Sequence, residues 1–172
     1  MSDLPFELSD KRLDGNRAES EFVDAVLHRK PNTVVMKSST DQDRNGHFDF
    51  LVNDYKVDVK ARKNMGVLNH DFQKYCVLEL QDVYGKRGWL YSDADYIAFE
   101  ITNFFVVCPR LELVDYVEKH VKDEFVIDSN DAINKKYTRF GAVDIITAVP
   151  WDEIQTENCF AVRKINYDDN NL

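Results

Sequence analysis

The chain contains 172 residues, of which 44% are hydrophobic and 12% aromatic, a composition typical of one globular domain with a sizeable core. The formal net charge of −9 argues against a protein whose whole surface binds nucleic acid, but it is compatible with a local basic site. No stretch approaches the apolar length of a membrane span, and the N-terminus lacks a secretory signal. Because Cys76, Cys108 and Cys159 are odd in number and widely spaced, a disulfide framework and a zinc ribbon are disfavoured, and we expect a soluble cytoplasmic protein.

The first third of the chain predicts a helix followed by a strand. Segment 14–32 has apolar residues at helical spacing, with Asp14 or Asn16 as the N-cap and an end before Pro31. Segment 33–38 is a short apolar run that favours a buried strand.

Segment 48–62 (FDFLVNDYKVDVKAR) predicts a strand hairpin. Asn53-Asp54 is typical of a two-residue turn, because both residue types tolerate a positive φ. That turn would place Phe50 opposite Val57, Asp49 opposite Asp58 and His47 opposite Lys60. One face would then belong to the core (Phe48, Phe50, Val52, Tyr55, Val57 and Val59) and the other would be mostly polar (His47, Asp49, Leu51, Lys56, Asp58, Lys60 and Arg62).

The rest of the chain predicts further strands and one helix. Strands are expected in segments 75–83, 95–101 and 103–110, the last two joined by a Thr102-Asn103 turn. A helix is expected in segment 111–121, and a strand with a turn in 142–154. The prediction is a single α/β domain over residues 1–172, with a mixed β-sheet flanked by helices and with residues 1–10 and 166–172 peripheral or flexible.

Two opposed aspartates need a physical explanation. At an effective dielectric constant near 20, two unit charges about 5 Å apart repel by roughly 3 kcal/mol. A divalent cation removes that repulsion, and paired carboxylates suit Mg²⁺, or Mn²⁺ as its substitute. Lys60 lies two residues after Asp58 on the same strand face, where it could assist an attacking water or stabilise transition-state charge. The pattern indicates metal-assisted phosphodiester hydrolysis.

These residues resemble the signature of the PD-(D/E)XK nuclease superfamily: Asp49, eight residues, then Asp58-Val59-Lys60. The family's proline is replaced by Phe48. The resemblance implies a restriction endonuclease-like core and an acid on the first helix, for which Glu19 is the first choice and Glu21 the second.

Further inferences follow from the resemblance. It implies that Asp49, Asp58 and Glu19 hold the metal, that these residues and Lys60 are catalytic, and that the protein is a DNA endonuclease acting on duplex or branched DNA. Segment 88–100 is similar to the strand region of phage-type and archaeal Holliday junction resolvase-like members, which suggests a phage-encoded protein and leaves a homodimer open.

Other interpretations of the same residues stay open. A solvated hairpin face with Asp–Lys pairs explains the lysines well but explains two opposed aspartates poorly. A non-catalytic acidic interaction protein, acting as a DNA mimic or inhibitor, needs only distributed acidic surface. Secondary candidates are residues that could orient water, contact a phosphate or stack on a base, with ordinary surface or packing roles favoured for most of them (His47, Glu79, Gln81, Trp89 and Tyr91).

Overall fold

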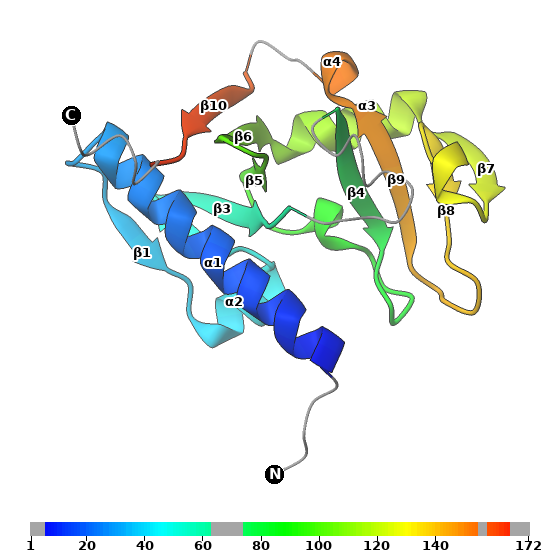
Figure 1. Ribbon diagram of the computed structural model, residues 1–172, viewed down its shortest axis with the longest axis horizontal. Helices are drawn as coiled ribbons and strands as arrows, with labels where there is room; N and C mark the ends of the chain where they lie inside the picture. Colours follow the sequence, from blue (N-terminus) through cyan, green and yellow to red (C-terminus); the bar gives the residue numbers. More distant parts are fainter. Residues whose placement is uncertain (1–5, 63–73, 155–157, 166–172) are drawn as a thin grey trace.

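The computed structural model describes residues 6–62, 74–154 and 158–165, and it shows an α/β fold with two mixed β-sheets (Figure 1). The first sheet has the strand order β1-β2-β3-β5-β6-β10, and the second has the order β4-β9-β8-β7. In the described part of the chain, no helix is long and apolar enough to cross a membrane. The α/β class is therefore as predicted, but the strands form two sheets where one was expected.

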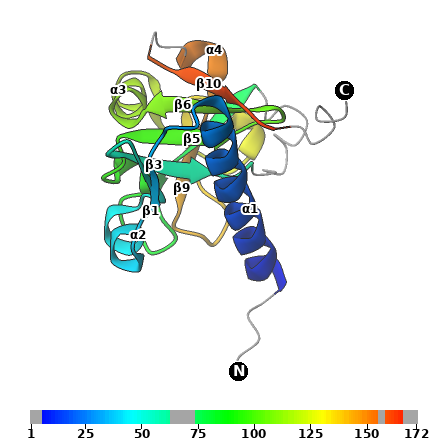
Figure 2. The same ribbon diagram turned by 90° about the vertical axis from the view of Figure 1, so that its left-hand side faces the viewer.

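Helix α1 (Phe6–Arg29) covers one face of the first sheet (Figure 2). Ala18, Phe22 and Ala25 are its buried residues, and the Phe22 ring packs edge-on against Phe105 of β6. The helix ends before Pro31 as predicted, but it begins well before the predicted cap at Asp14 or Asn16. Residues 6–13 contain strong helix formers, and Gly15 is accommodated inside the helix at a cost of about 1 kcal/mol. Residues 6–10 are thus helical, while 1–5 and 166–172 lie outside the described residues.

The predicted hairpin forms with the predicted turn. Strands β2 (Phe50–Val52) and β3 (Tyr55–Lys60) pair in the register Phe50–Val57, and both turn residues have positive φ, 48° at Asn53 and 70° at Asp54. Strand β1 (Val35–Lys37) joins the outer edge of β2. The two-residue turn therefore fixes the register as expected from its sequence.

The register predicted beyond Phe50 is wrong. The Asp49 N–H donates to Val57 O, so Asp49 and Phe50 both lie opposite Val57, which is the arrangement of a β-bulge. The expected cross-strand pairs 49–58, 48–59 and 47–60 are absent from the described ladder. An inserted residue reverses the alternation of faces, so Phe48 packs on the face opposite to Phe50.

The predicted core face of the hairpin also needs correction at the turn. Phe50, Val57 and Val59 are buried beneath α1, but Tyr55 is 56% exposed at the end of the hairpin. On the other face, Leu51 is partly buried against the core that lies between the two sheets. Both faces of the sheet are therefore covered, which leaves a buried environment around the polar residues of β3.

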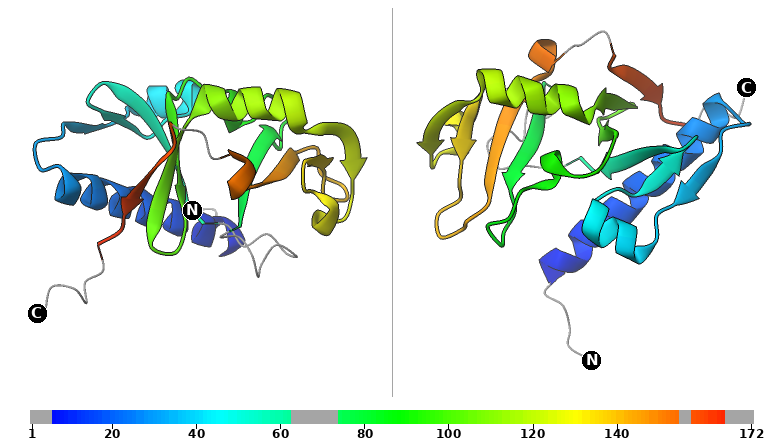
Figure 3. Two further views of the ribbon diagram at one scale, coloured as in Figure 1. Left: turned by 90° about the horizontal axis from the view of Figure 1, so that it is seen from above. Right: turned by 180° about the vertical axis from the view of Figure 1, so that it is seen from behind.

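The rest of the first sheet contains the predicted β5–β6 pair. Strand β5 (Tyr96–Glu100) runs parallel to β3 and antiparallel to β6 (Phe104–Pro109), and the short 102–103 connection is as expected. Strand β10 (Phe160–Arg163) adds antiparallel to β6 at the sheet edge. Helix α3 (Arg110–His120), also predicted, lies away from α1 and next to the second sheet (Figure 3).

The second sheet contains the predicted strands β4 (Tyr75–Gln81) and β9 (Ile145–Pro150), paired antiparallel. Strands β7 (Lys122–Val126) and β8 (Lys135–Tyr137) complete it, and neither was predicted because both are short, charged and without clear alternation. Helix α4 (Trp151–Ile154) follows β9, and single 3₁₀ turns cover Trp89–Tyr91 (η2) and Ser129–Asp131 (η3). Helix α2 (Thr40–Gly46) was also missed, although Ser39 and Gln42 form a capping box.

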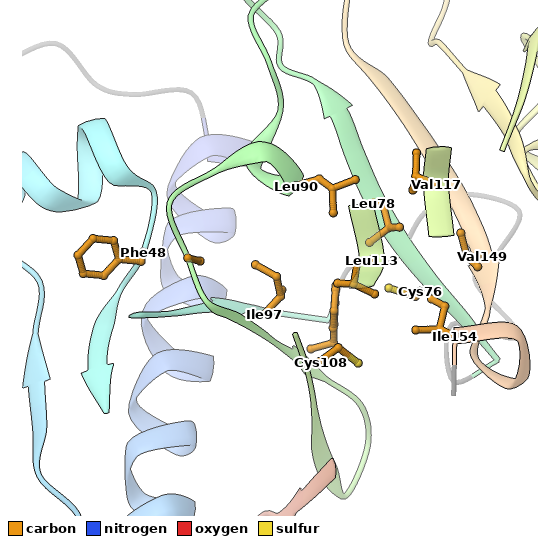
Figure 4. Packing of buried hydrophobic residues seen from close by; sticks show 12 residues of the cluster. Phe48, Cys76, Leu78, Leu90, Ile97, Cys108, Leu113, Val117, Val149 and Ile154 are labelled. Carbon is orange, nitrogen blue, oxygen red and sulfur yellow. The ribbon is translucent and has the colours of Figure 1, made fainter. Parts of the chain in front are cut away.

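The main core lies between the two sheets (Figure 4). It joins Ile97 of β5, Leu78 of β4, Leu90 of η2 and Leu113 of α3, all of them fully or almost fully buried. Phe48 belongs to the same cluster but lies to one side of it in Figure 4. The core face of β5 that meets the second sheet is therefore the same face that carries Asp58 and Lys60 on the adjacent β3.

A buried carboxylate ties α1 to the sheet. Glu100, at the end of β5, is bound by both guanidinium nitrogens of Arg17 at 2.8 Å, by the Arg62 N–H at 2.9 Å and by the Lys164 ammonium. Burial raises the pKa of Glu100, but these hydrogen bonds outweigh it and lower the pKa to about 2. The helix, the end of β3 and the segment after β10 therefore meet at one ionised group.

We predict that Glu100→Gln lowers the free energy of unfolding at neutral pH by roughly 2–4 kcal/mol, because the buried charge partner of Arg17 and Lys164 is lost. The native pKa lies below the ordinary value of 4.5, so this stabilisation is present above about pH 4.5 and disappears as the pH falls toward 2. Urea unfolding between pH 3 and 7 measures it. Glu124→Gln, in the exposed Lys135 ion pair, is the control and should change little.

Candidate functional site

Asp58 and Lys60 lie on the face of β3 that turns away from α1. Asp58 is only 2% exposed, and the Lys60 ammonium lies 2.8 Å from its Oδ2. This contact has ion-pair distance but lacks hydrogen-bond geometry, so Asp58 Oδ2 has no hydrogen-bond donor among the described residues. A buried carboxylate that relies on one ammonium is incompletely satisfied.

Asp49, the bulge residue, lies beside this pair. Its Oδ2 accepts a 2.7 Å hydrogen bond from the Val59 N–H, so the side chain takes the place of a main-chain acceptor. Burial raises the pKa of Asp49, and the negative charges of Asp58 and Glu19 raise it further. The Val59 hydrogen bond and the Lys60 charge oppose this shift, yet the pKa remains at about 7. Asp49 and Asp58 thus interact as like charges, as the sequence suggested, although they are not directly paired in the ladder.

Glu19 approaches from the opposite side of the sheet. It lies on α1, its side chain is 18% exposed, and its Oε2 accepts from the Lys37 ammonium at 2.9 Å. The hydrogen bond from Lys37 to Glu19 raises the pKa of Lys37, with smaller contributions from Asp49 and Asp43. Glu19 is therefore near enough to Asp49 to influence its ionisation, but its carboxylate is held by the end of β1.

The 3₁₀ turn η2, which packs beside β4 of the second sheet, positions Lys60. The Lys60 ammonium lies 4.8 Å from the centre of the Trp89 ring, and that ring also packs on Phe99 in the core. Gly88 makes this possible, because a Cβ at that position would overlap the backbone of Glu79 and Leu80 on β4. Lys60 is therefore held between a carboxylate on its own strand and the aromatic face of Trp89 in η2.

The remaining candidates lie elsewhere. Glu21 binds Arg17 and Lys164 beside Glu100, and Gln81 donates to Val143 O in the segment before β9. Glu79 lies on β4 of the second sheet, whereas β3 belongs to the first sheet. Its Oε1 accepts a long hydrogen bond from the Trp89 N–H, with 3.5 Å between the oxygen and the nitrogen. His47 is the exposed C-cap of α2, with φ of 50°.

Two clusters of basic residues in the sequence, at 86–87 and 135–139, have local explanations. Lys135 pairs with Glu124 and Lys136 with Asp123, which is the behaviour of a solvated face. Arg87 stacks on the Tyr91 ring at 4.7 Å. A third cluster of basic residues lies in and just after the hairpin (Lys56, Lys60, Arg62 and Lys63). In it, the Lys56 ammonium lies 5.4 Å from the centre of the Phe48 ring, and Lys63 lies outside the described residues.

The donor set for a cation consists of two carboxylates. Within residues 6–62, 74–154 and 158–165, no group of three or more His, Cys, Asp or Glu side chains converges so that it could hold a metal. Asp49 and Asp58 supply oxygen ligands of the kind that Mg²⁺ and Mn²⁺ prefer, and these hard cations commonly keep several waters when only one or two carboxylates bind them. The residues fit such a cation without a third acid.

Comparisons with protein-family models, with curated proteins and with solved structures gave no match. What the structure brings together is a buried Asp58, a bulge residue Asp49 with a raised pKa, and Lys60 between them and the Trp89 ring.

Sequence reasoning missed the contact between Lys37 and Glu19. Lys37 lies two residues after Val35 in the predicted strand 33–38, so both side chains are on the same strand face. Because Val35 packs toward α1, strand periodicity could have placed Lys37 on the face that α1 covers. The bulge at Asp49 had no such signal, because the two alternating runs continue across it without interruption in the sequence.

The raised pKa of Asp49 predicts an unusual pH dependence of stability. An unfolded aspartate ionises near 3.8, so between pH 4 and 7 the folded protein keeps a proton that the unfolded chain has lost. The free energy of unfolding contributed by this group therefore falls as the pH rises through that window. In the presence of a chelator, Asp49→Asn should raise the free energy of unfolding by roughly 2–4 kcal/mol above pH 7, and the gain should shrink toward pH 4.

Urea unfolding from pH 4.5 to 8.5 tests this expectation. Asparagine keeps an oxygen that can accept from the Val59 N–H, so the comparison isolates the charge. Asp54→Asn removes the same charge from the exposed turn and is the matched control. A gain at Asp49→Asn that is equal at every pH would contradict the raised pKa.

Proposed function

We propose that this protein is a metal-dependent DNA endonuclease that hydrolyses phosphodiester bonds. The observation that carries the proposal is the pair of neighbouring carboxylates, Asp49 and Asp58, with the Lys60 ammonium in direct contact with Asp58 and close enough to Asp49 to influence its ionisation. Duplex or branched DNA is the proposed substrate, and a restriction endonuclease-like site is the proposed class.

The charge balance supports a cation at this position. Two ionised carboxylates and one ammonium leave an excess negative charge in a largely buried environment, which is unfavourable. Asp49 and Asp58 would hold the divalent cation, which would supply polarisation of a phosphoryl oxygen and acidification of a bound water. Glu19 is not needed as a direct ligand, and its negative charge would strengthen the attraction through Asp49.

Lys60 is the residue proposed to act on the transition state. Its side chain is 24% exposed, so the ammonium can reach a substrate phosphate while its contacts to Asp58 and Trp89 restrict its position. A positive charge fixed in this way stabilises the negative charge that develops on the phosphoryl oxygens without reorganisation. Lys56, on the same face of β3, supports binding of the DNA backbone.

The competing proposal is a non-catalytic acidic interaction protein. It is favoured by the net charge of −9 and by the pairing of Asp58 with Lys60, which a structural ion pair also explains. The two proposals differ in what Lys60 does. In the interaction protein, Lys60 only compensates a buried charge, so its removal would change stability and no reaction rate.

Removing the Lys60 ammonium should abolish cleavage. We expect Lys60→Ala to reduce the rate of DNA cleavage by about 10²–10³-fold while much of the DNA affinity remains, because the loss falls on the transition state. Supercoiled plasmid, linear duplex, single strand and a four-way junction would be incubated with Mg²⁺, Mn²⁺ or a chelator, and products followed on gels. Lys56→Ala, on the same strand and face, is the matched control: it should weaken DNA binding but leave the cleavage rate at saturating DNA close to that of the wild type.

Two results would refute the catalytic assignment. One is a purified wild-type protein that cuts none of these DNA forms with either metal. The other is a Lys60→Ala protein that cuts as fast as the wild type. The acidic interaction protein would then be the better account of the site.

Divalent metal should stabilise the fold, because a ligand that binds only the native state raises the melting temperature by mass action. We expect a rise of a few degrees, about 2–5 °C, at 10 mM Mg²⁺ and pH 8. Asp58→Asn should lose this response while remaining folded by circular dichroism, and Asp54→Asn should keep it. A wild-type melting temperature that Mg²⁺ and Mn²⁺ leave unchanged would argue against the metal site.

A further inference from the structure

Two cysteines meet across the edge of the first sheet. Strand β10 pairs with β6 in the register Phe160–Val107, and one step outward the same register places Cys159 opposite Cys108. The Lys164 N–H donates to Asn103 O, which marks that position as a hydrogen-bonded pair. Because hydrogen-bonded and non-hydrogen-bonded pairs alternate in antiparallel strands, Cys108 and Cys159 occupy a non-hydrogen-bonded position.

That position suits a covalent link between the strands. Opposed Cα atoms at non-hydrogen-bonded positions are about 4.5 Å apart, within the range of about 4.4–6.8 Å that a disulfide spans. The two thiols already contact each other, since their hydrogen bond, together with burial, raises the pKa of Cys108. Sequence spacing alone gave no reason to expect this, because the cysteines become neighbours only through the β6–β10 pairing.

The two thiols differ in accessibility. Cys108 is fully buried in the core between the sheets, where Figure 4 shows it beside Ile97 and Leu113, whereas Cys159 is half-buried at the rim of that core. A third thiol, Cys76 of β4, is 1% exposed and close enough to Cys159 for their charges to interact. An oxidant therefore reaches Cys159 first, and Cys108 is the better-aligned second thiol.

We propose that Cys108 and Cys159 form an intramolecular disulfide when the protein meets a small-molecule disulfide such as oxidised glutathione. The Cys159 thiolate attacks one sulfur of the reagent, forms a mixed disulfide and releases one glutathione thiolate. The Cys108 thiolate then attacks the Cys159 sulfur and releases the second. Two protein thiols are oxidised, one disulfide is reduced to two thiols, and the two protons lost from the protein are taken up by the leaving thiolates.

The bridge would fix the last strand of the first sheet. It links β6 to the start of β10 and so closes a loop that contains α3, β7, β8, β9 and α4. A crosslink across such a long loop restricts the unfolded chain more than the folded one. Lys164 follows β10 and binds Glu100, so the bridge and this ion pair would fix β10 at its two opposite ends. The proposal does not depend on nuclease activity.

The experiment incubates the full chain with oxidised glutathione for several hours, because burial of both thiols slows the exchange. Peptide mapping without reduction should find Cys108 and Cys159 linked, with the mass lower by two hydrogens. The oxidised protein should melt on the order of 5 °C higher than the reduced protein. Cys159→Ser should show neither effect, whereas Cys76→Ala should show both.

The other outcomes overturn the proposal. They are a bridge between Cys76 and Cys159, a lasting mixed disulfide of Cys159 with glutathione and no internal bridge, or three unmodified thiols after the incubation. If Cys76→Ala fails to fold, the peptide map of the wild-type protein alone decides between the two pairings, since each gives a linked fragment of different mass.

Discussion

The carboxylate of Glu100 determines where α1 lies relative to the strands of the site. Apolar packing of Ala18 and Phe22 holds the helix on the sheet, but such contacts tolerate sliding along the strands. The two-pronged contact from Arg17 has a fixed geometry and sets the helix along its axis. Since the same carboxylate also accepts the Arg62 N–H just after β3, the strand that carries Asp58 and Lys60 is positioned by the same group.

The bulge at Asp49 gives one side chain both a structural and a chemical part. By accepting the Val59 N–H, the Asp49 carboxylate replaces a main-chain acceptor and holds its own oxygens close to β3. The position is unfavourable for its negative charge, as the raised pKa shows. A simple solvated hairpin would relieve this by turning the aspartate outward. Bulges beside functional sites commonly redirect a side chain in this way. A carboxylate whose negative charge is unfavourable, as the raised pKa of Asp49 indicates, is one that a bound cation would stabilise.

How much the sequence could predict depended on whether a feature was local. The turn at Asn53-Asp54 and the pairing of Phe50 with Val57 were predictable because two residues with positive φ fix the register nearby. The loss of the Asp49–Asp58 opposition was not, since bulging is decided by what each face packs against. The division into two sheets was also hidden, because β4 has the same apolar character whichever sheet it joins. The location of Lys60 beside Asp58 could be predicted from their spacing on one strand, but its Trp89 partner depends on the tight packing of Gly88 against β4.

The acidic character of the chain bears on how the site could meet a phosphate backbone. A net charge of −9 repels DNA at long range, so binding would have to rely on short-range contacts within about a Debye length of 10 Å. At Asp49 and Asp58 the local charge is also negative unless a cation is present, so metal and substrate would bind in support of one another. Lys60 cannot replace the cation in this role, because its charge is already engaged by Asp58. On the proposed function, the same residues would bind DNA with metal and repel it without metal, so the divalent cation would determine whether this face attracts or excludes nucleic acid.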